Sequence, residues 1–268
     1  MKYETKEISA INFQKFIDQT HLKKTFHQTK NFGDFRNAIN EQIFYTGISQ
    51  AEKIIGVALI QKIKTKIKTY LHCPHGPILD ESNPDAWNNF LEFYKNFGKQ
   101  QQADFVRISP LLPNTIEFEN IFKNQKFKNA PIHLVNPEHT LILDITQSED
   151  ELLKNMKKST RYEVRRIDKM GIKVMTGTDN KNFENFWELH HETVKRQKFN
   201  PFPKSHTKKE LDIFNKNIEI LTAQIDDHFL NQKSSVHVVQ IIFNNLICYN
   251  SVFFAQKECS SPNYFRII

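Results

Sequence analysis

The segment from residue 148 to residue 174 combines residue types that could bind phosphate. Ser148 is followed three residues later by Glu151, and Thr160 is followed in the same way by Glu163. Each pair predicts a capping box, in which a hydroxyl and a carboxylate satisfy backbone N–H groups at the start of a helix. The sequence therefore predicts two short helices in close succession.

The second of these helices is expected to have a basic face. Residues 151–173 contain eight Lys or Arg and only three Asp or Glu. Arg161, Arg165 and Lys169 recur four residues apart, so they share one side of a helix. N–H groups at a helix start, next to guanidinium groups, form a receptor for phosphate. The pattern predicts a phosphorylated ligand; the alternative is a solvated basic surface, which most charged runs are.

The composition is that of a folded, basic protein. The 268 residues are 39% apolar and include 23 Phe, which is enough for a sizeable core. The formal charge of +7 favours anionic partners: nucleic acid, nucleotide or anionic lipid. The three cysteines are widely spaced, which indicates a reducing compartment and no disulfide framework.

Hydropathy gives no sign of a membrane helix. No uninterrupted apolar run approaches the roughly 18 residues that such a helix needs, and the first 25 residues lack a signal-peptide core. We therefore expect no transmembrane segment and a cytoplasmic location, with the inner face of the membrane as an open alternative.

The first half of the chain predicts helices and strands in alternation. An amphipathic helix around residues 13–17 precedes three strand-like segments, a long helix, a short strand and a short helix. In order, the segments after the first helix are 42–48, 54–62, 64–72, 83–98, 105–108 and 116–122.

The second half predicts a similar order. A strand, two helices and three strands are expected at 172–175, 183–195, 204–215, 218–225, 236–243 and 246–255, with a tight turn at Asn244-Asn245. The fold class is therefore predicted to be α/β (α+β), with two domains at 1–138 and 139–268. Because the first half continues with a helix, a strand and another helix, the second domain is expected to be incomplete at Ile268.

Several motifs in this order resemble the FemABX family, aminoacyltransferases that build the peptide cross-bridge of peptidoglycan. They are the GPILD turn, the FVRISP strand, the run LDIT…ELLKNMKKSTRYEVRR and the ETVKR helix. The resemblance implies two tandem GNAT-like domains. It also implies transfer of an amino acid from aminoacyl-tRNA to the stem-peptide amine of a nucleotide- or lipid-linked peptidoglycan precursor. Aminoacyl-tRNA is then the co-substrate, and no cofactor or metal is expected.

The resemblance also implies site residues. Arg36, in NFGDFRN, stands where the family places a basic residue that reaches the phosphates of the precursor, and one of Arg161, Arg165 or Arg166 should supply the second phosphate contact. Ser109 is the candidate catalytic residue: it stands where some members have an Asp near the reacting groups, although a serine cannot be a carboxylate base. The family also has a Phe-Lys motif near its C-terminus, which has no counterpart before Ile268.

Two other functions remain open at this stage. An acyl-CoA-dependent GNAT N-acyltransferase would need a glycine-rich turn for pyrophosphate, and no two of the seven glycines are separated by a single residue. A non-catalytic relative could instead bind tRNA or precursor, or pair with a paralogue through its second sheet. A metal site at His72, Cys73 and His75 is disfavoured, because the spacing matches no zinc pattern.

Overall fold

A computed structural model describes residues 2–130, 146–167, 172–225, 235–243 and 246–255. The chain divides into two compact units, Met1–Thr140 and Leu141–Ile268, and each is considered by itself. The predicted boundary after residue 138 falls on residues outside the described ranges. Among the described helices, none is long and apolar enough to cross a bilayer.

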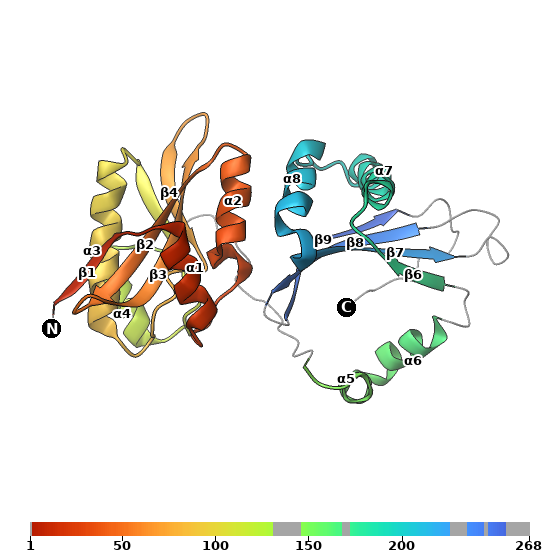
Figure 1. Ribbon diagram of the computed structural model, residues 1–268, viewed down its shortest axis with the longest axis horizontal. Helices are drawn as coiled ribbons and strands as arrows, with labels where there is room; N and C mark the ends of the chain where they lie inside the picture. The colour runs from red at the N-terminus through yellow and green to blue at the C-terminus, as the bar shows by residue number, and fades with distance from the viewer. Residues whose placement is uncertain (1, 131–145, 168–171, 226–234, 244–245, 256–268) are drawn as a thin grey trace. The chain divides into compact units, whose positions relative to one another are not determined.

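The first unit contains one five-stranded sheet with helices on both faces (Figure 1). The strands lie side by side in sequence order, antiparallel except for the parallel pair β4–β5. The elements are β1 (Tyr3–Glu7), α1 (Ala10–Gln19), the 3-10 helix η1 (Phe26–Gln28), α2 (Lys30–Ala38), β2 (Gln42–Gln50), β3 (Lys53–Lys64), β4 (Thr69–Pro74), α3 (Pro84–Gln100), β5 (Phe105–Ser109) and α4 (Ile116–Asn124).

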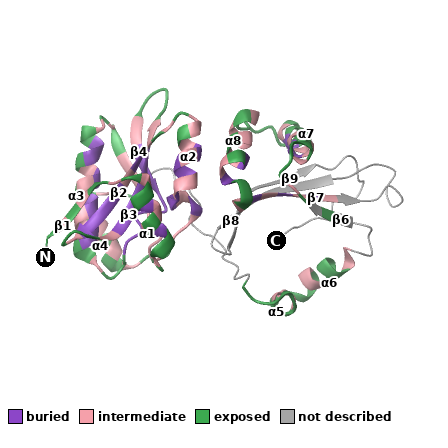
Figure 2. Ribbon diagram, in the orientation of Figure 1, coloured by how far each residue is buried: buried purple, intermediate pink, exposed green. Residues whose placement is uncertain are grey.

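Strand β3 is the centre of this unit. Val57, Ala58, Leu59 and Ile60 are all fully buried, although successive side chains point to opposite faces of the sheet. Both faces are therefore covered, which explains why this strand is a continuous apolar run rather than an alternating one. Figure 2 shows the buried residues concentrated in the central strands and on the helix faces toward them.

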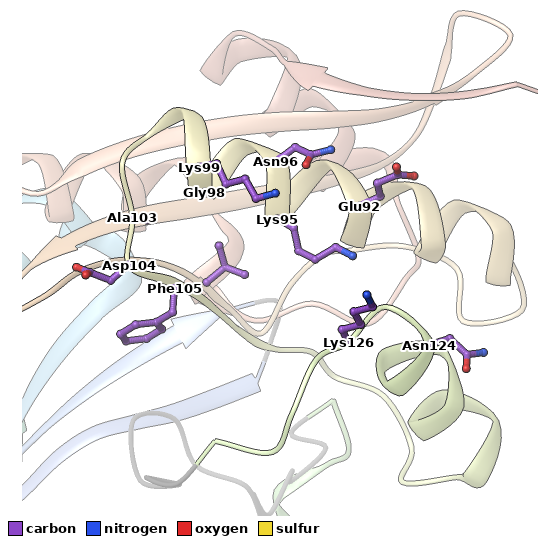
Figure 3. Close-up of a pocket in the computed structure, with 11 residues that line it drawn as sticks. Glu92, Lys95, Asn96, Gly98, Lys99, Ala103, Asp104, Phe105, Asn124 and Lys126 are labelled. Atoms are coloured by element: carbon purple, nitrogen blue, oxygen red, sulfur yellow. The ribbon is translucent and has the colours of Figure 1, made fainter.

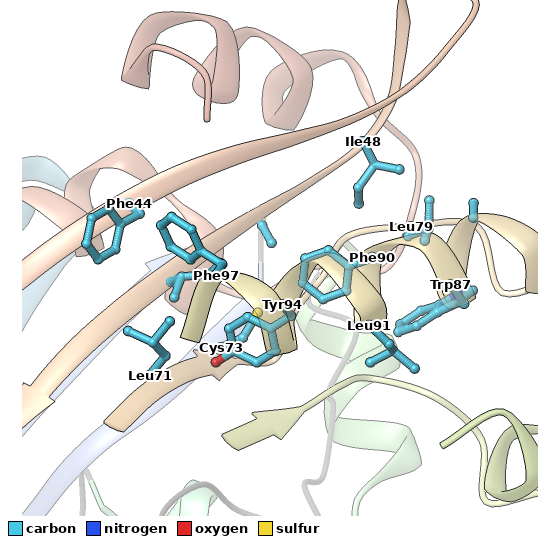
Figure 4. Packing of buried hydrophobic residues seen from close by; sticks show 13 residues of the cluster. Phe44, Ile48, Leu71, Cys73, Leu79, Trp87, Phe90, Leu91, Tyr94 and Phe97 are labelled. Carbon is cyan, nitrogen blue, oxygen red and sulfur yellow. The ribbon is translucent and has the colours of Figure 1, made fainter. Parts of the chain in front are cut away.

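Helix α3 forms one side of the core. Trp87, Phe90, Leu91 and Tyr94 recur with helical spacing and are fully buried. They pack on Leu71, Cys73 and other sheet residues, as Figure 4 shows. Asn83 caps the helix by accepting a hydrogen bond from the backbone N–H of Ala86, and Pro84 occupies the first turn. The predicted helix at 83–98 is therefore confirmed.

The strand predicted at 64–72 is wrong at its start, because residues 65–68 form a turn. The backbone N–H of Thr65 donates to the carbonyl of Lys68, and its side chain accepts from the N–H groups of Ile67 and Lys68. The alternation of Lys and Ile continues through this turn and imitates a strand. The exposed edge strand β1 and helix α2 had no predicted counterpart, and both have too few apolar residues to give a clear period.

The second unit contains a four-stranded antiparallel sheet, ordered β6-β7-β8-β9. Its elements are α5 (Glu149–Asn155), α6 (Lys158–Arg166), β6 (Ile172–Thr176), α7 (Asn180–Gln197), α8 (Lys204–Phe214), the 3-10 helix η3 (Asn215–Asn217), β7 (Ile218–Ile225), β8 (Ser235–Phe243) and β9 (Leu246–Ala255). Helix α7 buries Phe183, Phe186, His190 and Thr193.

The two units repeat one order of elements. A strand, two helices and three antiparallel strands form β1-α1-α2-β2-β3-β4 in the first unit and β6-α7-α8-β7-β8-β9 in the second. The predicted α/β class is confirmed, and the repeat appears in the same order in both halves. The predicted turn at Asn244-Asn245 and the expected incompleteness near Ile268 lie outside the described residues.

Candidate functional site

The carboxyl ends of β4 and β5 meet at one edge of the first sheet, because these two strands are parallel. In their register, Pro74 at the end of β4 lies opposite Ser109 at the end of β5. Ligands of open α/β sheets bind at the carboxyl ends of parallel strands. The predicted site residue Ser109 is therefore at a position from which its hydroxyl can face a ligand, and β4 leads directly into His75 and the cis peptide Gly76-Pro77.

Gln28 holds η1 against this strand end. Its side-chain amide donates to the carbonyl of Pro74 over 2.7 Å and to that of Leu59 over 3.2 Å, and its oxygen accepts from the Leu59 N–H over 2.7 Å. The side chain is completely buried. A side chain at Gly76 would have its Cβ 2.6 Å from the Gln28 amide nitrogen, so glycine allows the close approach. These bonds bring residues more than 45 positions apart to one place.

Two histidines pack together beside this contact. The rings of His27 and His75 are 4.6 Å apart between centroids, and the Thr25 hydroxyl lies 2.9 Å from Nδ1 of His75. Burial lowers the pKa of His27 to about 3, helped by the nearby His75, His72 and Arg36. Burial also lowers the pKa of His75. Both imidazoles are therefore neutral near pH 7, and burial makes them weaker bases than a histidine in water.

Sequence reasoning missed this histidine pair. In the sequence, His75 stands out as part of a disfavoured metal site with His72 and Cys73, and Thr25, His27 and Gln28 carry no signal. The fold brings them together across 46 to 50 residues of chain, a distance that no local motif spans. The dipeptide Gly76-Pro77 after a buried strand was the one available pointer to a special turn.

Arg36 lies on α2, next to the histidine pair. Its guanidinium group is 5.8 Å from the ring centroids of both Phe32 and Phe35 and forms an ion pair with Glu41. The Phe32 ring meets His27 edge-on, with centroids 5.0 Å apart. Arg36 and the end of β4 are thus linked by a chain of contacting rings. That Arg36 binds phosphate stays a prediction.

The basic helix of the second unit starts earlier than predicted. Helix α6 begins at Lys158 with Lys157 as its N-cap residue, so Thr160 lies inside the helix and the predicted capping box at Thr160 and Glu163 is wrong. Lys158 and Ser159 occupy helical positions before Thr160. The other capping box is confirmed: the Ser148 hydroxyl accepts from the Glu151 N–H, and the Glu151 carboxylate accepts from the Ser148 N–H.

The start of α6 retains the features of an anion receptor. In the part of the chain that the structure describes, Lys157 gives the helix no side-chain cap, so its first N–H groups have no such acceptor. The exposed Arg165 lies on this helix, and Arg166 forms a 3.9 Å ion pair with Glu163. The third residue of the predicted basic face, Lys169, lies outside the described ranges.

Arg161 has a structural partner. Its Nη1 donates to the carbonyls of Leu153 and Lys154, over 3.2 and 2.8 Å. These carbonyls belong to the last turn of α5, and that of Leu153 also accepts from the backbone N–H of the C-cap residue Met156 over 3.3 Å. Arg161 therefore fixes α5 to α6.

Within the described residues, no group of three His, Cys, Asp or Glu side chains could hold a metal ion.

Comparisons with known proteins agree with this fold. Lipid II:glycine glycyltransferase of Staphylococcus aureus strain MRSA252 is 29% identical over 157 residues, which are 55% of this chain and 37% of that protein. The same enzyme from strain N315 matches with the same identity and coverage. The chain thus spans well under half the length of these relatives.

A crystal structure of FemX superposes with a TM-score of 0.69 at 20% identity, covering 84% of this chain and 58% of that one. At this identity the likeness supports the fold. The family model described as the FemAB family matches residues 8–133 and 122–235, and thus most of both units. On these matches, the chain belongs to the FemAB family.

Proposed function

We propose that this protein transfers an amino acid from aminoacyl-tRNA to the stem-peptide amine of a peptidoglycan precursor. The observation that carries the proposal is the family match over both units, together with relatives named lipid II:glycine glycyltransferase. The precursor is lipid-linked or nucleotide-linked, and the relatives' name favours the lipid-linked form.

The reaction is aminolysis of an activated ester. The attacking ammonium group must lose a proton, its nitrogen must be held near the ester carbonyl, and the developing oxyanion needs hydrogen-bond donors. The neutral His75 at the end of β4 offers ring nitrogens for hydrogen bonding in this region, whereas the pKa of His27, about 3, makes that ring too weak a base to take the proton of an ammonium group. Ser109, at the end of the neighbouring strand, can donate or accept a hydrogen bond but cannot act as a carboxylate base.

The phosphates of the precursor require cations or helix N-termini. In the second unit, the start of α6 offers N–H groups without a side-chain cap, and Arg165 offers a guanidinium group in the last turn of the same helix; both support a role in binding phosphate. In the first unit, Arg36 is a second candidate cation, provided that a phosphate displaces Glu41 from it. These roles are part of the proposal.

The test is a transfer assay with the 268-residue protein. tRNA charged with one radiolabelled amino acid at a time is incubated with a lipid-linked or a nucleotide-linked precursor, and label on the precursor is measured after hydrolysis of the tRNA. We expect label on the precursor only when charged tRNA is present. Acetylation of a test amine from acetyl-CoA, without transfer from tRNA, would instead identify an acyl-CoA-dependent enzyme.

A binding measurement separates the remaining alternative. If calorimetry shows that the precursor binds while no amino acid supplied on tRNA is transferred, the chain is a binding protein rather than a transferase. Mixing it with a co-expressed paralogue then tests whether activity needs a partner. If the precursor neither binds nor reacts, the proposed acceptor is wrong.

A further inference from the structure

A lysine-rich hairpin extends from the first unit at the end of the sheet opposite to the candidate site. Strand β2 pairs with β3 only as far as Lys62, so the hairpin formed by residues 62–69 continues beyond the neighbouring strand (Figure 1). We call these residues the lysine hairpin. They include lysines at alternate positions, namely Lys62, Lys64, Lys66 and Lys68, and no acidic residue.

The tip of the lysine hairpin is ordered and displays an aliphatic side chain. Thr65 accepts from the N–H groups of Ile67 and Lys68, and both its N–H and its hydroxyl donate to the Lys68 carbonyl. This network holds the turn in one conformation. Ile67 nevertheless leaves 87% of its surface exposed. The exposure of an isoleucine side chain to water is unfavourable in free energy. An ordered turn that exposes one therefore suggests a contact surface.

The hairpin is joined to the start of β5. Lys68 forms an ion pair with Asp104 over 2.8 Å, and the same carboxylate accepts from the Thr69 N–H. The next residue, Phe105, stacks on Tyr70 with ring centroids 4.8 Å apart, and 47% of Phe105 is exposed. The residues that follow the tip, 68–70, are thus joined by direct contacts to Asp104 and Phe105.

A basic groove adjoins Phe105. It has a volume of about 500 Å³ and lies between the C-terminal half of α3, the start of β5 and the end of α4. Figure 3 shows three lysines along it, Lys95, Lys99 and Lys126, with Asp104 and Glu92 as its acidic residues. Together with the exposed lysines of the hairpin, the cations of this surface clearly outnumber its carboxylates.

We infer that the lysine hairpin and the adjoining groove dock this protein on an anionic lipid bilayer, with Ile67 and Phe105 entering the interface and the lysines facing lipid phosphates. Lysines near an anionic membrane are attracted to it, and apolar side chains add binding free energy by leaving water. Nucleic acid would use the lysines equally well. It offers bases that stack on aromatic rings, but it gives an exposed isoleucine no comparable partner.

This inference goes beyond the proposed function and does not depend on it. The docking surface lies at the start of β4, at Thr69, whereas the candidate site lies at its end, at Pro74. Vesicle binding needs neither donor nor acceptor. A failure to bind vesicles would therefore leave the transfer reaction untouched, and a failed transfer assay would leave the docking surface untouched.

The experiment is co-sedimentation of the protein with unilamellar vesicles. Vesicles with about 30 mol% anionic phospholipid should bind the wild-type protein, and vesicles of neutral phospholipid should bind it far more weakly. The double variant Lys64→Ser, Lys66→Ser should partition about 30-fold less, since each lysine near such a surface contributes roughly a fivefold factor. Ile67→Ser should reduce partitioning about tenfold, since an isoleucine leaves water on insertion.

Two matched controls separate this surface from the general positive charge of the chain. Lys2→Ser with Lys53→Ser removes the same charge from exposed residues at the opposite end of β3, and should leave partitioning nearly unchanged. Ile116→Ser removes another exposed isoleucine, 78% accessible and next to Glu117, and should also have little effect.

Several outcomes would overturn the inference. One is an equal loss in the hairpin and control variants, because binding would then be non-specific adsorption. Another is binding of the wild-type protein to neutral and anionic vesicles alike. A third is the absence of vesicle binding while uncharged tRNA binds with a strong dependence on Lys64 and Lys66 and none on Ile67, which would assign the surface to nucleic acid.

Discussion

Glu41 engages two donors of the Arg36 guanidinium group. Nε of Arg36 donates to one carboxylate oxygen over 2.7 Å, and Nη2 donates to the other. Both side chains are mostly buried, with about a fifth of each exposed. This is the geometry with which an arginine binds a phosphate, so the carboxylate takes the place that an anionic ligand would need.

Our first prediction concerns this pair. If Arg36 binds the precursor phosphates, Glu41→Gln should tighten binding several-fold, because it removes the competing charge and leaves the guanidinium group in place. Arg36→Ala should weaken binding by about 1.5–3 kcal/mol, the usual contribution of a hydrogen bond to a charged group. Isothermal calorimetry with a diphosphate-containing precursor measures both changes.

The matched control is Glu119→Gln. It makes the same charge change in the same unit, at an exposed carboxylate that pairs with Lys123. It should leave precursor affinity as it is. If Glu41→Gln and Glu119→Gln behave alike, and Arg36→Ala lowers only the free energy of unfolding, the Arg36–Glu41 pair has a structural role alone.

Hydrophobic periodicity was sufficient to predict several elements. Helix α3 buries one face with regular spacing, and strands β7 and β9 were predicted with their observed bounds, 218–225 and 246–255. Prediction failed where two local signals compete. The spacing of Thr160 and Glu163 predicts a helix cap at Thr160, but helical φ/ψ values begin before it, at Lys158.

The candidate site was less predictable than the fold. Arg36 was identified through a resemblance, and nothing local indicated that Glu41 would hold it, since Glu41 lies beyond the end of α2. The pairing of His27 with His75 depends on a contact between η1 and the end of β4. Such contacts arise from the tertiary fold, which local motifs do not encode.

Our second prediction separates Arg161 from Arg165. Arg161 donates to the last carbonyls of α5, so Arg161→Ala should leave these acceptors without this partner and loosen the α5–α6 pair. We expect amide hydrogens of α5 and α6 to exchange about tenfold faster, which corresponds to roughly 1.4 kcal/mol. Hydrogen-exchange mass spectrometry measures this.

Arg165→Ala is the matched variant, because Arg165 is exposed on the same helix. It should leave exchange unchanged while weakening precursor binding. If Arg165→Ala accelerates exchange as strongly as Arg161→Ala, the carbonyl contacts of Arg161 have no special role. If Arg165→Glu leaves precursor affinity unchanged, α6 is a solvated basic surface.

Our third prediction is a loss of stability in mild acid that depends on His27. The folded protein holds the pKa of His27 near 3, mainly through burial, whereas the unfolded chain takes up the proton near 6.5. Between these values the unfolded state binds more protons, so the free energy of unfolding falls as pH falls. From pH 6.5 to pH 5 the loss due to His27 should be about 1.6 kcal/mol.

The measurement is urea unfolding of the first unit at both pH values. In a Trp187→Phe background, the fluorescence of Trp87, which is buried in the first core, reports this unit. Between pH 6.5 and pH 5, the free energy of unfolding should fall more for the wild-type protein than for His27→Gln, whatever the stability of the variant at pH 7. Equal losses would show that His27 is accessible to protons in the folded state.

Our fourth prediction concerns Gly33, which lets α2 approach the sheet. A Cβ at this position would collide with the Tyr45 hydroxyl and lie 2.9 Å from Tyr45 Cζ and 3.3 Å from Leu59 Cδ1. Gly33→Ala should therefore lower the free energy of unfolding by about 1–3 kcal/mol, because overpacking outweighs the better helix propensity of alanine. Asn37→Ala, at an exposed position of the same helix, should cost nothing or stabilise slightly.

Tyr45→Phe should partly rescue Gly33→Ala, because it removes the nearest colliding atom. The hydroxyl of Tyr45 is 3.5 Å from the Lys30 carbonyl, a long hydrogen bond whose loss costs little. A double-mutant cycle by urea unfolding should give a favourable coupling of about 1 kcal/mol or more between the two substitutions. Additive effects would mean that α2 moves away from the sheet when residue 33 gains a side chain, and that the approach of Arg36 to His27 does not depend on this glycine.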